Sequence, residues 1–296
     1  MDRAEKDPHD GSAPLGGRSD ATTGLVVISE THTGDMAKKS VFSEENFIPG
    51  VFNYCNAWCE RCPFRLRCRN YAMGADEDGN PIDYHAEGGR EKIEENLRKA
   101  FDMPENEDQE RDFDPEDLMN VEEPDPEELK EWEEEEERER TTAREHPLHA
   151  ITMEYSECAR EWLETNEERI DQRLRVLQSS LENHNDGSRL ANASEVAHWY
   201  VFMIHVKTHR ALRGINDMHE EHWESPIQSD ANGSAKVALL GAEESLSAWV
   251  DLTETLPDGQ DELMPLISLL RRIIRLIERT FPDVRKFVRA GFDDGQ

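Results

Sequence analysis

The feature that most constrains the fold is a long series of apolar residues, spaced three or four apart, that begins after Pro147. This spacing places side chains on one face of an α-helix, and proline suits the first turn of a helix. Three further amphipathic helices follow, over about 192–213, over 234–255 and up to Pro282. Four such helices with mostly short connections predict an antiparallel four-helix bundle, so we expect an all-α fold.

The first of these helices keeps its apolar stripe over about nine turns. The stripe consists of Leu148, Ile151, Tyr155, Cys158, Trp162, Ile170, Leu174, Leu177 and Leu181. Because Cys158 belongs to it, we expect this cysteine to be a small buried residue of the core. The turn-forming sequence at 185–187 predicts the end of the helix, and the capping-box pattern at 192–195 predicts the start of the next.

The second helix is apolar nearly all round, which predicts a central, buried position. Glu195 and His198 form the i, i+3 pair that di-iron bundles use, but those bundles need a second pair, and no histidine follows His222. His205 and His209 share an edge of the helix with His198 and could hold a metal ion together. A hydrophilic edge of a buried helix is the more common arrangement.

Lys207 lies on the apolar face of the same helix. A lysine there must find an acidic partner, shift its pKa, line a pocket or extend its ammonium group to solvent. Arg210 is close enough along the helix to form an anion-binding pair with it. Glu195, His198, Lys207 and Arg210 are therefore the candidate pocket residues if the protein is an enzyme.

A second region contains four of the five cysteines within fourteen residues. Cys55, Cys59, Cys62 and Cys68 have the spacing C-x3-C-x2-C-x5-C. Thiolates are preferred ligands of soft and borderline metals, and four complete a tetrahedral zinc site or hold an iron–sulfur cluster. A module of this size buries little core, so we expect the metal to supply folding energy and nearby aromatic residues to shield it.

The close spacing of the four cysteines and Pro63 after the third favour a [4Fe-4S] cluster over zinc, whose ligands usually come as two separated pairs. Residues 59–68 resemble the iron–sulfur loop of endonuclease III-type DNA glycosylases and RecB-type nucleases, where C-x2-C-P-aromatic-x3-C supplies three of the four cluster cysteines. In those families the first cysteine lies further upstream than Cys55 does here. The resemblance implies a [4Fe-4S] cluster and not DNA repair, because neither a helix-hairpin-helix nor a nuclease core is evident.

The cysteines allow two other interpretations. The first three cysteines have the spacing of radical-SAM enzymes. Those enzymes need a cluster iron that is left open, which Cys68 would occupy, and a β/α barrel, for which no alternating strands follow. The segment could also carry no metal. The chain as a whole resembles uncharacterised bacterial proteins that pair such a cysteine motif with helices.

The chain is strongly acidic, with a formal net charge of −32. This charge argues against nucleic acid and anionic membranes as partners, because both would be repelled. Residues 101–145 hold 22 acidic and 5 basic residues, so they contribute −17 of the total and the rest of the chain −15. A general excess of carboxylates, with 9 lysines against 25 arginines, is associated with life in high salt. The composition therefore favours a halophilic host.

We divide the chain into a disordered tail (1–40), a cysteine module (41–90), a short helix with an acidic linker or solvated helix (91–145) and the bundle (146–290). No secretory signal or membrane span is evident, so we expect a soluble, cytoplasmic protein. Two functions remain open. The first is a metal-binding protein that transfers electrons or binds an unknown protein or small molecule. The spacing of its cysteines favours an iron–sulfur cluster over zinc. The second is an enzyme with the bundle pocket and a structural metal.

Overall fold

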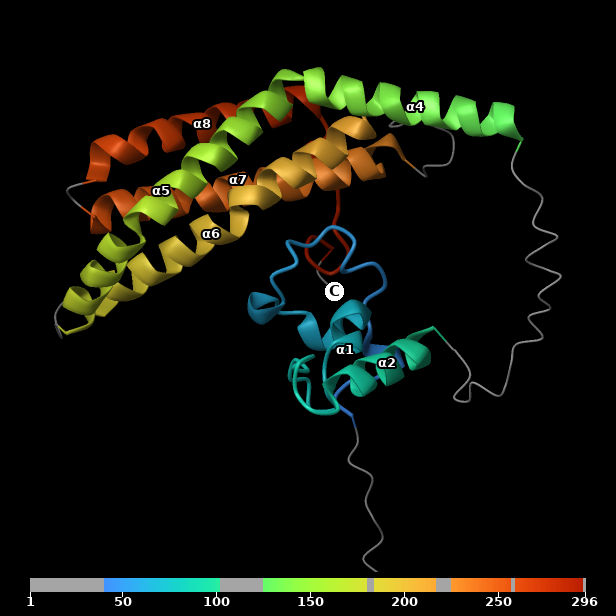
Figure 1. The fold of residues 1–296 in the computed structure, drawn as a ribbon, viewed down its shortest axis with the longest axis horizontal. Helices are drawn as coiled ribbons and strands as arrows, with labels where there is room; N and C mark the ends of the chain where they lie inside the picture. The colour runs from blue at the N-terminus through green and yellow to red at the C-terminus, as the bar shows by residue number, and fades with distance from the viewer. Residues whose placement is uncertain (1–39, 102–124, 180–183, 217–224, 257–258, 295–296) are drawn as a thin grey trace, which may run out of the picture. The chain divides into compact units, whose positions relative to one another are not determined.

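The computed structural model describes residues 40–101, 125–179, 184–216, 225–256 and 259–294. Helices dominate these ranges, and their β-structure is limited to one isolated bridge between Ala75 and Pro81. The expectation of an all-α fold is confirmed (Figure 1). All described residues belong to one compact unit, 39–296. None of the described helices is long and apolar enough to cross a membrane.

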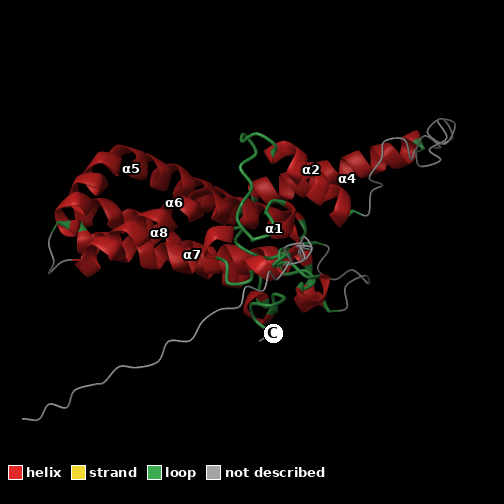
Figure 2. Ribbon diagram, turned by 90° about the horizontal axis from the view of Figure 1, so that it is seen from below, coloured by secondary structure: helices red, strands yellow, loops and turns green. Residues whose placement is uncertain are grey.

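Four long helices form half of the described chain. They are α5 (Pro147–Gln178), α6 (His184–Arg213), α7 (Asp230–Thr255) and α8 (Gln260–Thr280). Helix α6 packs most extensively on α7 and also on α5, whereas α8 packs on both α7 and α5. Each helix thus has two neighbours, and both views show the four side by side (Figures 1 and 2). This pairing is the one that a four-helix bundle requires.

The core between these helices includes large aromatic side chains. Tyr155, Tyr200, Trp249 and Phe281 are all fully buried. The Tyr155 hydroxyl lies 2.5 Å from the hydroxyl of Ser245 and accepts a hydrogen bond of 2.9 Å from the Trp249 indole nitrogen. The buried polar atoms of the two rings are therefore partnered, so the aromatic area stabilises the bundle without a desolvation penalty.

The predicted boundary between the first two helices is wrong. Helix α6 begins at His184, so both the turn sequence 185–187 and the capping pattern 192–195 lie inside it. Gly187 is buried against α5, where an added Cβ would lie 3.4 Å from the Cβ of Leu177. Leu190 and Ala193 are also fully buried. The apolar face therefore continues through both patterns, and its burial outweighs local turn propensity.

The prediction for Cys158 is also wrong, because this residue is exposed. The inward positions of α5 are taken by Ser156 and Ala159, which are small and buried. The Ser156 hydroxyl donates a 2.6 Å hydrogen bond to the carbonyl of Val201 on α6. The close approach of the two helices at these small residues turns Cys158 towards solvent.

Helix α4 (Pro126–Glu145) occupies the stretch for which the sequence left a solvated helix or a disordered spacer open. The Asp125 side chain caps it by accepting a hydrogen bond of 2.9 Å from the backbone N–H of Glu127. Ala143 is the buried residue of this helix, whereas Trp132 is 63 % exposed. The helix contacts α5 and α6, so the described part of the acidic region is a mostly solvated helix that rests on the bundle.

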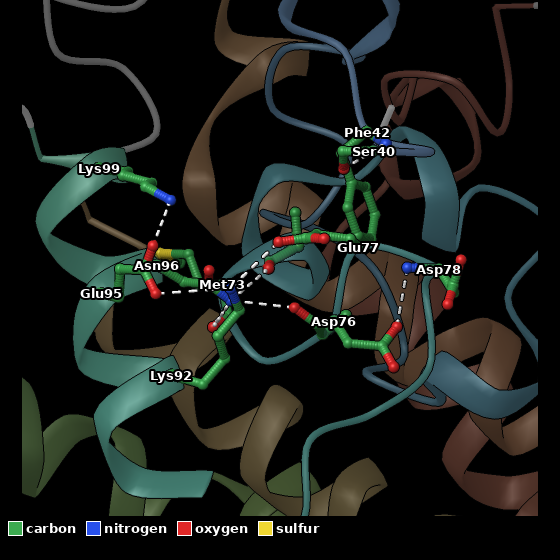
Figure 3. A network of polar contacts seen from close by, with 12 residues as sticks. Ser40, Phe42, Met73, Asp76, Glu77, Asp78, Lys92, Glu95, Asn96 and Lys99 are labelled. Carbon is green, nitrogen blue, oxygen red and sulfur yellow. Dashed lines mark hydrogen bonds and ion pairs between the residues drawn. The ribbon is translucent and has the colours of Figure 1, made fainter. Parts of the chain in front are cut away.

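The cysteine region contains two short helices, α1 (Arg69–Met73) and α2 (Gly89–Ala100). The Asn96 amide of α2 donates hydrogen bonds to the carbonyls of Ala72, Met73 and Ala75, the last at 2.9 Å (Figure 3). Helix α2 confirms the helix expected from about residue 91, and this amide fastens it to the end of α1. The predicted N-terminal tail lies outside the described residues, apart from residue 40.

Candidate metal centre

Tight turns bring the four cysteines together locally. Two 3₁₀ turns, Cys59–Arg61 and Arg65–Arg67, each end immediately before another cysteine. The backbone N–H of Cys62 donates to the carbonyl of Cys59 at 3.2 Å, and that of Cys68 to the carbonyl of Arg65 at 3.3 Å. Cys68 is buried and the other three are partly exposed. The segment therefore coils compactly and keeps its sulfurs near one another.

The sulfur atoms accept backbone hydrogen bonds. The N–H of Ala57 donates to the Cys55 Sγ at 3.4 Å. Burial raises the pKa of Cys62, and a backbone hydrogen bond from Phe64 partly offsets this rise. Ala57 has a φ of +55°, a left-handed conformation that residues other than glycine rarely adopt. Hydrogen bonds to sulfur favour the thiolate and tune the potential of metal–thiolate centres.

The electrostatics of the thiols show that they share one neighbourhood. Burial raises the pKa of Cys59, and the nearby Cys55, Cys68 and Cys62 raise it further. Like charges disfavour one another, so a cation between the four sulfurs would relieve this repulsion. In their present orientation, no three His, Cys, Asp or Glu side chains of the described residues are arranged to hold a metal ion.

A stacked tryptophan pair joins the cysteine segment to the bundle. Trp58, which precedes Cys59, is only 6 % exposed, and its ring lies parallel to that of Trp199 on α6 with centroids 4.7 Å apart. The Arg61 guanidinium lies 4.1 Å from the Trp58 ring centroid. Arg61 also donates to Asn192 at 2.8 Å and forms an ion pair with Glu195. These contacts extend the bundle's core into the cysteine segment.

Asn56 makes a second connection between the segment and α6. Its side-chain amide donates to the Tyr200 hydroxyl at 2.7 Å, and its carbonyl accepts from the Trp199 indole N–H at 3.0 Å. The Tyr200 hydroxyl in turn donates to Glu244 of α7 at 2.8 Å. The residue between Cys55 and Ala57 is therefore held by two aromatic side chains of the bundle.

Tyr54 makes a third connection, directly before Cys55. Its hydroxyl donates to Asp230 at 3.1 Å, and burial followed by the Asp230 charge raises the pKa of Tyr54 to about 12. Its ring packs edge-on against Phe287 with centroids 4.7 Å apart. Gly233 of α7 is required here, because a Cβ would lie 2.3 Å from the Tyr54 ring. The Tyr54 ring therefore packs directly on the backbone of α7 at Gly233, which fixes this part of the cysteine segment against the helix.

A small apolar cluster lies on the other side of the segment. Cys68 is buried with Ile48 and Val51, and Phe64 packs edge-on against Phe292 with centroids 4.9 Å apart. The C-terminal residues after α8 therefore contribute to the environment of the cysteines, which sequence periodicity alone did not indicate.

The candidate pocket residues on α6 have mostly found other partners. Glu195 pairs with Arg61, and the Nδ1 of His198 lies 2.8 Å from the carbonyl of Ser194. Arg210 makes two hydrogen bonds to Asp230, at 2.9 and 2.6 Å. Of these candidate residues, Arg210 lies close enough to Lys207 to lower its pKa, after the larger effect of burial.

Lys207 itself is half-buried and lines an open hollow of about 340 Å³ with Trp199, Phe202, Met203 and Val206. Burial lowers the pKa of Lys207, and the Arg210 charge lowers it further. The thiol of Cys55 and the carboxylate of Asp230 act in the opposite direction. The lysine thus belongs to the electrostatic environment of Cys55, a relation across 152 positions of sequence that helical periodicity does not reveal.

Neither protein-family models, nor curated proteins, nor solved structures give a match to this chain.

Proposed function

We propose that Cys55, Cys59, Cys62 and Cys68 hold one metal centre, and that this centre is a [4Fe-4S] cluster. The observation that carries the proposal is the placement of four cysteines within fourteen residues that fold into consecutive tight turns. An all-thiolate donor set suits an iron–sulfur cluster and is also a structural zinc set. The proline after Cys62 and the close spacing favour the cluster.

The environment of the sulfurs supports a redox-capable centre. Cys68 lies in an apolar cluster, and Cys55 and Cys62 accept backbone hydrogen bonds. Burial and hydrogen bonds to sulfur are the means by which proteins set cluster potentials. When bound, a cluster would supply one-electron transfer; the surrounding residues position the thiolates and limit water.

We propose a non-catalytic role, in electron transfer or in binding a partner. Trp58 is adjacent to Cys59 and stacks on Trp199, which lines the hollow on α6. The proposed centre is therefore joined by aromatic contacts to an apolar surface at which another molecule could bind. A cluster of reduced cysteines favours the cytoplasm as the compartment.

Anaerobic purification of the full chain tests the metal centre. We expect brown protein with a broad visible absorption and about four irons per chain. Cys68→Ser should lose this absorption, whereas Cys158→Ser, a matched change of an exposed cysteine outside the site, should keep it. Colourless protein with about one tightly held zinc would replace the cluster by a structural zinc site.

The alternative is an enzyme whose pocket includes Lys207, with the metal in a structural role. The lowered pKa of Lys207 and its position in the hollow favour this reading, because a lysine that loses its proton more easily can act as a base or nucleophile. Trapping with a carbonyl reagent and borohydride tests it: Lys207→Arg should abolish labelling, while Lys236→Arg should not. Equal labelling of both variants would dismiss a reactive lysine at this position.

A further inference from the structure

Three histidines meet on the side of the bundle formed by α5 and α6. His149 comes from α5, and His205 and His209 lie one turn apart on α6. The ring centroid of His149 lies 4.8 Å from that of His205 and 5.2 Å from that of His209, and the two α6 rings are 6.3 Å apart. The sequence indicated only the α6 pair, because His149 is distant in the chain.

The hydrogen bonds of Thr152 determine which nitrogen of His205 is free. The Thr152 hydroxyl is within reach of the carbonyls of Leu148 and His149, at 2.9 and 3.0 Å, and donates its single proton to them. Its oxygen therefore accepts from the Nδ1–H of His205, 3.0 Å away. This leaves the Nε2 of His205 with its lone pair. Metal-binding histidines are commonly fixed in this way by a hydrogen bond at the other nitrogen.

The other two histidines have buried nitrogens without a protein partner. The Nδ1 atoms of His149 and His209 are shielded from solvent and form no hydrogen bond. Buried polar atoms are seldom left unpaired, and those that are commonly mark a bound water or ion. Both nitrogens belong to one cluster, which suggests a single missing ligand.

The charges around the cluster are nearly balanced. Arg144 of α4 and Arg213 of α6 lie close enough to lower the pKa of His209, after the larger effect of its burial. Arg213 is paired with Glu136 and Glu139 of α4, at 3.4 and 3.3 Å. Burial also lowers the pKa of His149 and lowers that of His205 to about 4. The imidazoles are therefore neutral at neutral pH, the form that binds metals.

We propose that His149, His205 and His209 bind one divalent transition-metal ion, with zinc as the natural occupant. At a Zn–N distance of about 2.0–2.1 Å, tetrahedral imidazole ligands have ring centroids about 5.2 Å apart. The observed separations are 4.8, 5.2 and 6.3 Å, so one equals this value, one is shorter and one is longer. Three protein ligands leave the fourth position to water, an arrangement typical of catalytic and not of structural zinc.

Binding requires a local adjustment of two rings. As the side chains lie, no three such residues within the described ranges converge on an ion. The rings of His149 and His209 can turn about χ2, a broad torsion, and their Nδ1 atoms have no hydrogen bond to lose. His205 can stay as it is, held by Thr152. Rotation of these two rings is therefore the change that the proposal requires.

Cobalt substitution tests the site without relying on the cysteines. The full chain, with its cysteines already occupied or alkylated, is titrated with Co²⁺ while visible absorption is recorded. We expect one equivalent to bind with the d–d bands of a tetrahedral ion and without the thiolate charge-transfer band that a cysteine site would give. Excess Zn²⁺ should displace it.

The variants His209→Gln and His198→Gln provide the matched pair. Both change a histidine of α6 to an uncharged side chain, but His198 is exposed and outside the cluster. We expect His209→Gln to weaken Co²⁺ binding at least 100-fold and His198→Gln to leave it unchanged, with both variants showing the helical circular dichroism of the parent. Absence of Co²⁺ and Zn²⁺ binding by the parent chain, or equal binding by both variants, would mean that the cluster holds only water.

Discussion

The helical bundle and the cysteine segment are stabilised by different means. The bundle buries whole faces of four helices, with fully buried residues such as Trp249 and Leu270. The cysteine segment buries only Ile48, Val51 and Cys68 in its own cluster and otherwise depends on hydrogen bonds and on its contacts with α6 and α7. Apolar burial is sufficient for the first region, whereas the second needs a partner surface and, we propose, a metal.

The difference explains why Trp58, a buried side chain of the segment, packs on the bundle and not in the segment's own apolar cluster. Trp58 belongs to the large core of the bundle and not to the small cluster around Cys68. Its neighbours Asn56 and Tyr54 also bond to bundle residues. The cysteine segment is thus held both by its contacts with the bundle and by the small apolar cluster.

A core substitution in the bundle should cause the largest loss of stability. Trp249→Ala removes a fully buried ring and the hydrogen bond to Tyr155, so we expect the free energy of unfolding to fall by about 3–5 kcal/mol. Denaturant unfolding followed by circular dichroism measures it. The exposed Trp132 of α4 provides the control, since Trp132→Ala should change stability by less than about 0.5 kcal/mol.

Loss of the tryptophan stack should have the next largest effect. Trp58→Ala removes a buried ring and its contact with Trp199, which we expect to cost about 2–4 kcal/mol. The loss should be visible as faster proteolysis within residues 41–90 while the bundle helices remain protected. Equal protection of both regions in the variant would show that the stack does not hold the segment to the bundle.

Mild acid should affect the bundle through its histidines. In the folded chain the pKa of His205 is about 4 and those of His149 and His209 are also lowered, whereas an unfolded histidine titrates near pH 6.5. Their contribution to stability is complete above about pH 6.5 and is lost as pH falls from there towards 4, because the unfolded chain takes up protons first. Arg144 and Arg213 add to the repulsion in the protonated cluster.

Thermal unfolding at pH 7.5 and pH 5, with no divalent metal added, measures this loss. The midpoint of the parent should fall more between the two values than that of His205→Gln, which lacks the most strongly shifted group. If the two chains lose the same amount, other groups account for the acid sensitivity.

Salt should have the smallest and most general effect. Carboxylates repel one another at low ionic strength, and salt screens them. With a net charge of −32, we expect the thermal midpoint to rise from low to molar salt. A midpoint that does not change over this range would remove the support for a halophilic host.

Periodicity predicted the all-α class and most of the long helices well, because an apolar stripe directly reports which face of a helix is buried. It placed the start of α5 at Pro147, and the helices from 234 to 255 and up to Pro282, within a few residues of their observed bounds. Its failures involve small residues that pack between helices. Gly187 was read as part of a turn although it lies inside α6, and Cys158 was placed in the core although Ser156 faces α6 instead. Close helix approach depends on the partner helix, which a single stripe does not specify.

The cysteines were evident from spacing, but the residues that hold them were not. Asn56 and Trp199 are 143 positions apart, and neither belongs to a recognisable motif. His149 likewise joins His205 only through the packing of α5 on α6. Such pairs depend on the register between helices, which is set by the whole core.

Native mass spectrometry of the anaerobically purified full chain tests the proposed centre most directly. The folded chain should exceed the sequence mass by one cluster of four irons and four sulfides, and the excess should vanish on acid denaturation, as expected for a centre held only by thiolate ligands. A mass equal to the bare chain under both conditions would contradict the proposal that the cysteine segment is completed by a metal centre.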